Sequence, residues 1–202
     1  MEREEQMRIT KFVCLMLVAL FASGCEPIMS LHPLFLEKDF VFDARLVGDW
    51  HDRDGKPCCR FEKSADGYTL FFLNKNGEPV NKYQAHLANL RGLLFLDILL
   101  KEAMPQDLFE RSFPLFLVPA HTFYQIRFEG ESFGYRFLDD EWIESMRKQK
   151  KLKLPCVQVD DLTVLTAPTD KLQKFVLKNL ETKDAFSPFE EGRLHRPTPS
   201  PQ

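Results

Sequence analysis

Residues 67–100 read "GYTLFFLNKNGEPVNKYQAHLANLRGLLFLDILL", and this stretch decides the fold class. Its apolar segments are separated by Asn76-Gly77 and Arg91-Gly92, which are dipeptides typical of tight turns. Between Lys82 and Leu87 polar and apolar residues alternate, so one face of this segment is apolar and the other is wet. Short alternating segments joined by glycine-containing turns predict an antiparallel β-meander.

The meander continues on both sides of this stretch. "CCRFEKSA" at 58–65 precedes it after a turn at Asp66-Gly67, and "HTFYQIRFEGESFGYRFL" at 121–138 supplies two further strands. Antiparallel sheets of this size close into barrels because closure removes their exposed edges. We therefore expect a mainly β protein with accessory α-helices, in which residues 46–186 form an antiparallel up-and-down barrel of about eight strands.

Two helices are expected outside this barrel. Residues 139–151, "DDEWIESMRKQKK", carry acidic residues at the start and basic residues at the end, as the helix dipole favours. Residues 169–180 form an apolar stripe, and Asp170 with Gln173 resembles a capping box. Between the helices, "CVQVDDLTVLTAP" predicts a strand pair that turns at Asp160-Asp161.

The segments that flank the barrel have distinct compositions. Residues 101–119, "KEAMPQDLFERSFPLFLVP", combine prolines with phenylalanines, which predicts a long loop or short helix folded over one end of the sheet. Residues 187–202 are rich in proline, and we expect this tail to be disordered.

The N-terminus has the layout of a secretory signal. After Met7, the expected start, Arg8 and Lys11 precede the apolar run Phe12–Ala22, which the small residues Ser23-Gly24 follow. The run is too short to cross a membrane, because a spanning helix needs about 20 apolar residues. Residues 1–24 are therefore expected to be a signal peptide and are excluded from the fold.

"ASGC" at 22–25 resembles the lipobox of bacterial lipoproteins. The resemblance implies that Cys25 is acylated, with palmitate among its acyl chains, and that residues 25–45 are a lipidated tether. Multiple acyl chains give a stable membrane anchor, whereas a single chain gives marginal binding. The alternative is an ordinary signal peptide with an unmodified Cys25. In this family Glu26 is compatible with the outer membrane, so the expected location is the cell envelope, facing the periplasm.

"LVGDW" at 46–50 holds Gly48-x-Trp50 just before the meander. This pattern is similar to the G-x-W motif of lipocalins, in which the tryptophan seals the closed end of the barrel. The resemblance implies that Gly48 and Trp50 have structural roles here.

The chain between Leu31 and Phe186 also resembles a group of uncharacterised bacterial lipoproteins. The resembling stretches are "HPLFLEKDFVFDARLVGDW", "FEKSADGYTL", "AHLANLRGLLFLDI", "LVPAHTF" and "LTAPTDKLQKFVLKN". Because no biochemical activity is assigned to that group, the resemblance implies a location and a fold rather than a mechanism.

Composition excludes some partners. The net charge of −3 does not indicate the basic surface that binds nucleic acid. Beyond Cys25 the mature chain keeps Cys58, Cys59 and Cys156, an odd number that allows one disulfide and one free thiol. Strand alternation predicts that Cys59 faces the core and that Cys58 faces outward. A zinc site formed by Cys58, Cys59 and a distant histidine is an alternative, but the sequence shows no ligand spacing for it, so we expect neither a metal nor a cofactor.

Residues 130–134, "GESFG", match the G-x-S-x-G pattern of serine hydrolases. That motif needs a strand, a sharp turn and then a helix, whereas strands are expected on both sides of Ser132. The triad order also requires a histidine after the serine, and the one that follows is His195, in the tail. We therefore interpret this stretch as a hairpin turn and expect no catalytic residue.

Two other histidines, His121 and His86, have positions that bear on a possible site. His121 stands where a loop enters a strand, so it either contacts a ligand at the barrel mouth or hydrogen-bonds the preceding loop. His86 lies on the polar face of its strand and is expected to be exposed. Asp139-Asp140-Glu141 suits a helix N-terminus without any metal.

The apolar face of the strands is the remaining candidate site. The residues expected to point inward are Leu70, Phe72, Tyr83, Phe95, Tyr124, Ile126 and Phe128. Of these, Tyr83, Phe95, Tyr124 and Phe128, together with His121, are the candidate ligand-binding residues. An eight-stranded barrel is either filled by its side chains or holds one small ligand.

Three hypotheses follow. The first is a membrane-anchored module that binds a small apolar ligand in the bacterial envelope. The second is a packed barrel that docks an envelope protein through its outer face or through residues 105–119, and exposes an apolar patch. The third, an enzyme, has no nucleophile and base to support it.

Overall fold

The computed structural model describes residues 28–103, 120–159, 162–189 and 192–197. The predicted signal segment with Cys25, residues 104–119 of the predicted 101–119 loop and the predicted Asp160-Asp161 turn lie outside these residues, whereas residues 101–103 belong to a strand rather than to the loop. The strands are β1 (Met29–Ser30), β2 (Phe40–Val41), β3 (Gly48–His51), β4 (Pro57–Ser64), β5 (Gly67–Leu73), β6 (Pro79–Leu90), β7 (Leu93–Ala103), β8 (His121–Glu129), β9 (Ser132–Phe137), β10 (Cys156–Val159), β11 (Leu162–Leu165) and β12 (Gly192–His195). The helices are η1 (Glu37–Asp39), η2 (Ala44–Leu46), α2 (Asp140–Lys148) and α3 (Thr169–Asn179).

The central feature is a closed antiparallel barrel of eight strands, which confirms the predicted lipocalin-like fold class. Strands β3 to β9 follow one another around the barrel in chain order, and each pairs with its neighbour in antiparallel register. The strand order then runs from β9 through β12 back to β3. Closure leaves no free edge in the barrel itself.

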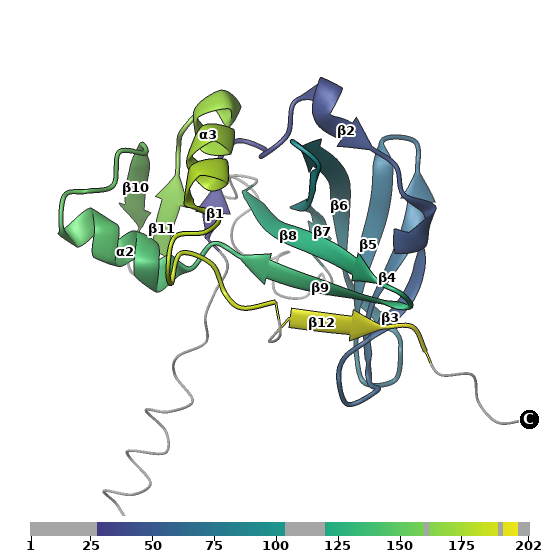
Figure 1. The fold of residues 1–202 in the computed structure, drawn as a ribbon. Helices are drawn as coiled ribbons and strands as arrows, with labels where there is room; N and C mark the ends of the chain where they lie inside the picture. The colour runs from purple at the N-terminus through teal and green to yellow at the C-terminus, as the bar shows by residue number, and fades with distance from the viewer. Residues whose placement is uncertain (1–27, 104–119, 160–161, 190–191, 198–202) are drawn as a thin grey trace, which may run out of the picture.

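The eighth barrel strand comes from the C-terminal tail. Residues 187–202 were expected to be disordered, and that expectation is wrong for β12. Leu194 pairs with Phe133 of β9, and His195 pairs with His51 of β3. The gap between β9 and β3 supplies backbone partners on both sides, so four residues are enough to complete the ladder. Figure 1 shows β12 lying between β9 and β3.

The helices and the β10–β11 hairpin pack outside the barrel, as expected (Figure 1). Their buried side chains meet the outer faces of β7 and β8 at Phe95 and Phe123, which are 0% and 1% exposed. Phe95 therefore points away from the interior, and its predicted orientation is wrong. Leu94, Leu96 and Ile98 take the inward positions of β7 instead. In the part of the chain that the structure describes, no helix is long and apolar enough to cross a membrane.

The tether packs against the barrel from residue 28 onward, as its apolar composition predicted. β1 pairs with β8 and β11, and β2 pairs with β6. The rings of Phe35 and Phe40 lie 4.5 and 6.0 Å from the His86 ring, so His86 is half-buried rather than exposed. This burial lowers the pKa of His86. The strand pattern alone did not show that a distant segment covers this face.

The N-terminus of α3 differs from the predicted capping box. Pro168 is the N-cap and makes no side-chain capping bond. The Gln173 amide instead donates hydrogen bonds to the Leu34 carbonyl, at 2.9 Å, and to the Asp39 carboxylate, at 2.7 Å. The glutamine therefore fixes the tether to α3 rather than capping its own helix. In α2 the expected charges are present, with Asp140 and Glu141 in the first turn and Arg147 and Lys148 in the last, and the Asp139 side chain also accepts a hydrogen bond from the Trp142 amide.

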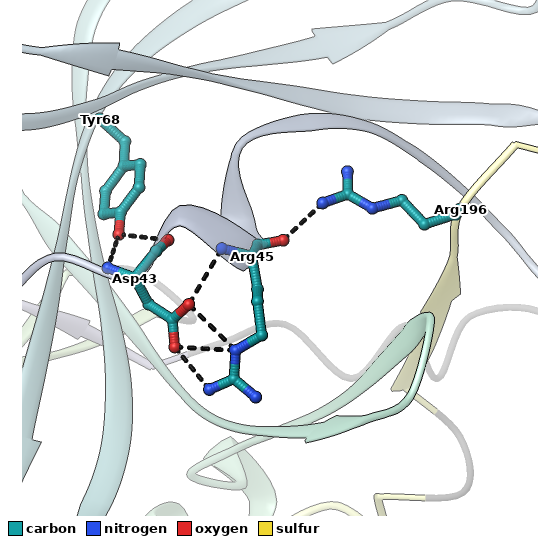
Figure 2. Close-up of polar contacts among 4 residues, drawn as sticks. All are labelled: Asp43, Arg45, Tyr68 and Arg196. Carbon is teal, nitrogen blue, oxygen red and sulfur yellow. Dashed lines mark hydrogen bonds and ion pairs between the residues drawn. The ribbon is translucent and has the colours of Figure 1, made fainter.

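The short helix η2 closes one end of the barrel, where Leu46 is fully buried in the interior core. The Trp50 indole donates to the Leu46 carbonyl at 2.8 Å, in keeping with the structural role expected of Gly48-x-Trp50. Figure 2 shows that the Tyr68 hydroxyl bonds both the amide and the carbonyl of Asp43, whose carboxylate binds Arg45.

Arg196, just after β12, completes this closed end. Its guanidinium lies 4.0 Å from the centre of the Trp50 ring. It also donates to the carbonyls of Arg45, Val47 and Asp49, and the contact with Arg45 is drawn in Figure 2. One side chain therefore supplies donors to three carbonyls where η2 leads into β3, of which those of Val47 and Asp49 are part-buried and that of Arg45 is exposed.

Candidate functional site

A small apolar pocket lies inside the barrel, toward the end opposite η2. Its volume is about 100 Å³. The wall is made by inward-facing residues of six strands, which are Cys58, Cys59, Phe61, Leu70, Phe72, Leu96, Ile98, Tyr124, Ile126, Phe133, Tyr135 and Leu194. Typical pockets for drug-sized ligands are about 300–1,000 Å³, so this one admits a single ring or the end of a chain.

Two tyrosines give the pocket its polar character. The Tyr124 and Tyr135 rings meet edge to face, with centroids 5.8 Å apart. Burial raises the pKa of Tyr124 to about 12, and burial also raises the pKa of Tyr135. Both phenols therefore stay protonated at neutral pH, and each carries a hydroxyl that can donate to a ligand.

The structure separates the five predicted ligand-binding residues. Tyr124 lines the pocket. Tyr83 and Phe128 face the interior core as expected, but Phe128 lies toward the closed end, where Arg45 stacks on its ring at 4.3 Å. Phe95 and His121 belong to the outer side of the barrel wall. Strand alternation therefore predicted the inward orientation of three of the five residues, of which Tyr124 lines the pocket.

His121 contacts a carboxylate rather than a ligand at the mouth. Its Nδ1 atom lies 2.6 Å from Asp97 Oδ1, and Asp97 is 1% exposed. The other carboxylate oxygen accepts a hydrogen bond from the Leu34 amide at 2.7 Å. A buried carboxylate needs such partners, and these two join the barrel wall to the tether. This structural role differs from both roles that the sequence suggested.

The two adjacent cysteines line the pocket but were not among the predicted ligand-binding residues. Cys59 faces the core as predicted, but Cys58 also lines the pocket instead of facing outward. The cause is a β-bulge. Trp50 pairs with Cys59 and His51 pairs with Pro57, so Cys58 has no opposite residue. A bulge re-aims a side chain that simple alternation would place on the other face.

A larger groove of about 590 Å³ lies outside the barrel, between the β3–β4 loop and the β8–β9 turn. Its wall carries charges of both signs together with His51, Ser132 and His195. The register places His195 directly opposite Ser132, not in a detached tail. The Ser132 hydroxyl donates to the Glu129 carbonyl at 2.8 Å.

The geometry around Ser132 is that of the predicted hairpin turn. Glu129 pairs with Ser132, and Gly130 has a φ of 59°, which glycine adopts without steric strain. Strands precede and follow the turn, so the strand–turn–helix geometry of a nucleophile elbow is absent at this site.

Comparison with known proteins adds no relative to this description. No protein-family model, no curated protein and no solved structure matches the chain. The pocket and the sequence are therefore the features from which a function is inferred.

Proposed function

We propose that this protein is a lipid-anchored lipoprotein of the bacterial envelope whose barrel binds a small apolar ligand. The observation that carries the proposal is the apolar pocket of about 100 Å³ inside a barrel closed at its other end. Cavities of similar size, about 150 Å³, bind benzene when apolar residues line them. The ligand class is therefore a single ring or a chain terminus, with a group that accepts a hydrogen bond from Tyr124 or Tyr135.

The anchor part of the proposal rests on the signal layout and on Cys25. Metabolic labelling with an alkyne fatty acid should mark the wild-type chain in the membrane fraction and leave Cys25→Ser unlabelled. Equal labelling of both chains, or none of either, would contradict acylation of Cys25. In a bacterium with two membranes, we expect the labelled chain to fractionate with the outer membrane.

The ligand part is tested by native mass spectrometry of the full chain released from detergent. We expect an extra mass that disappears on denaturation. Leu96→Trp should abolish it, because the indole would occupy the pocket that Leu96 lines. Leu93→Trp is the matched control, since Leu93 lies on the same strand and is 37% exposed. A bare mass for the wild-type chain would contradict the proposal.

An interaction function is the second candidate, and an exposed apolar surface favours it. Val157, Val159 and Leu162 of the β10–β11 hairpin are 46%, 53% and 41% exposed. β10 is also the terminal strand of the sheet order, and such an edge can pair with a partner strand. A photo-crosslinking residue at Val159 should then capture one discrete envelope protein, whereas one at the exposed Lys75 should not. Identical patterns from both positions would contradict docking at this edge.

We propose a binding role and no catalysis. The hydroxyl proton of Ser132 is engaged within its own turn, and the imidazole of His121 is engaged with Asp97. No histidine–carboxylate pair and no serine–histidine pair therefore lines the apolar pocket. Hydrolysis of model esters that falls in Ser132→Ala, but not in Thr122→Ala, would contradict this view.

A further inference from the structure

The adjacent thiols of Cys58 and Cys59 form a chemical feature that an apolar binding pocket does not need. The bulge at Cys58 turns both side chains toward the same pocket. Cys59 is 3% exposed and Cys58 is half-buried against the same core. Bulges are frequent next to functional sites, where they re-aim side chains.

The two cysteines are adjacent on β4, and both pack against the interior core. Both residues are free thiols.

The remaining pocket wall is apolar or aromatic. Phe72, Phe133 and Tyr135 line the same space as the two thiols. Such a wall excludes water and offers no hard oxygen ligand other than a phenol. A bound ion would have to be soft, because soft ions prefer sulfur and lose little by leaving water.

We propose that Cys58 and Cys59 together bind one monovalent copper ion, Cu(I), at the wall of the barrel pocket. Thiolate ligands select Cu(I), and this ion is satisfied by two sulfur ligands. Zinc and nickel need three or four protein ligands, and among the residues that the structure describes no group of three His, Cys, Asp or Glu side chains is placed to hold a metal.

Binding is a proton exchange without a change of oxidation state. Two S–H bonds break, two S–Cu bonds form, and two protons pass to solvent. Copper affinity therefore rises with pH, since deprotonated ligands are required. The inference uses the same pocket as the proposed function but does not depend on an apolar ligand.

The test is a Cu(I) titration of the reduced full chain in detergent, without oxygen, against a chromophoric Cu(I) chelator. The double variant C58S/C59S should retain one copper ion fewer per chain than the wild type. Cys156→Ser is the matched control, because Cys156 is also a free, half-buried thiol but lies in β10. It should retain as much copper as the wild type. Equal retention by the wild type and C58S/C59S would overturn the proposal.

A second measurement on the wild-type chain guards against a folding defect in the variants. Added Cu(I) should slow alkylation of Cys58 at least about tenfold while leaving alkylation of Cys156 unchanged, as peptide mass spectrometry reports. Equal rates at Cys58 with and without copper would overturn the proposal. A Cys58–Cys59 disulfide that survives reduction would overturn it too. The native mass measured without copper tests the apolar ligand separately, so the two proposals can fail independently.

Discussion

The two ends of the barrel differ in the contacts that their side chains make. At the closed end, polar bonds join segments far apart in the sequence, as when Arg196 holds the carbonyls of Arg45 and Val47. At the pocket end, the wall presents thiols and phenols toward a space of about 100 Å³. The contacts that stabilise the barrel therefore lie at the closed end, and the chemically reactive side chains lie at the pocket end. Substitutions at the two ends should have different consequences.

The largest effect is expected at the closed end, from Trp50→Ala. Trp50 is 1% exposed, packs edge to face on Phe133 at 4.6 Å and donates to the Leu46 carbonyl. Its loss leaves a cavity and an unsatisfied carbonyl, so we expect the free energy of unfolding to fall by about 3–5 kcal/mol. Urea unfolding followed by circular dichroism measures the change.

Trp142→Ala is the control for this prediction. Trp142 is the second of the two tryptophans and packs only partly buried on α2, outside the barrel. Its truncation should cost less than half as much. If the free energy of unfolding fell equally in both variants, the closed end would contribute no more to stability than the helices outside the barrel.

The next largest effect is expected where β12 closes the barrel beside the pocket. A Cβ atom at Gly192 would clash with the Tyr135 carbonyl oxygen. Gly192→Ala must therefore move β12 or β9, at a cost of about 3 kcal/mol. Gly134→Ala is the control on the paired strand, because its Cβ would meet a movable Phe189 ring atom at 3.3 Å. Equal unfolding midpoints for these two variants would show that β12 is dispensable for closure.

A smaller effect is expected from Arg196→Ala. The guanidinium serves three carbonyls and stacks on Trp50, so its removal should cost about 2 kcal/mol. Arg193→Ala, three residues earlier in β12, is the matched control. Its partner is Glu129, and both side chains are about one-third exposed, which limits the ion pair to about 1 kcal/mol or less. Thermal unfolding of the two variants measures the difference. Equal losses of stability would mean that removing a positive charge, and not the specific contacts of Arg196, causes the effect.

The sequence predicted the closed end better than the pocket. Gly48-x-Trp50 is a local pattern, and the glycine turns and strand alternation that follow it are local as well. Arg196 and β12 depend on a gap between β3 and β9 that exists only in the folded barrel. A proline-rich segment gave no periodic signal that four of its residues would fill that gap.

The pocket was obscured for two physical reasons. β7 is apolar on both faces because α3 and the tether cover its outer side, so alternation could not decide that Leu96 rather than Phe95 faces inward. The bulge at Cys58 then broke the alternation that β4 otherwise follows. His121 and Asp97 lie on neighbouring strands, and their pairing required the register of β7 against β8.

The smallest effect at neutral pH is expected at the pocket end, from Tyr124→Phe. The substitution removes a hydroxyl that interacts with Thr122, and this should cost no more than about 1 kcal/mol at pH 7. The effect of Tyr124→Phe should therefore be seen most clearly in how the free energy of unfolding depends on pH. Burial holds the pKa of Tyr124 at about 12 in the folded chain, against an ordinary value of 10.0.

The sign follows from proton linkage. Below pH 10 the phenol is protonated in both states, and its contribution to stability is fully present. Between pH 10 and 12 the unfolded state loses the proton while the folded state keeps it, so the wild-type chain loses up to roughly 2–3 kcal/mol of stability. Tyr124→Phe cannot lose a proton and should escape this part of the decline. Unfolding free energies measured from pH 9 to 12 should therefore converge or cross. Parallel curves would mean that Tyr124 reaches solvent, and that the pocket is wetter than its apolar wall implies.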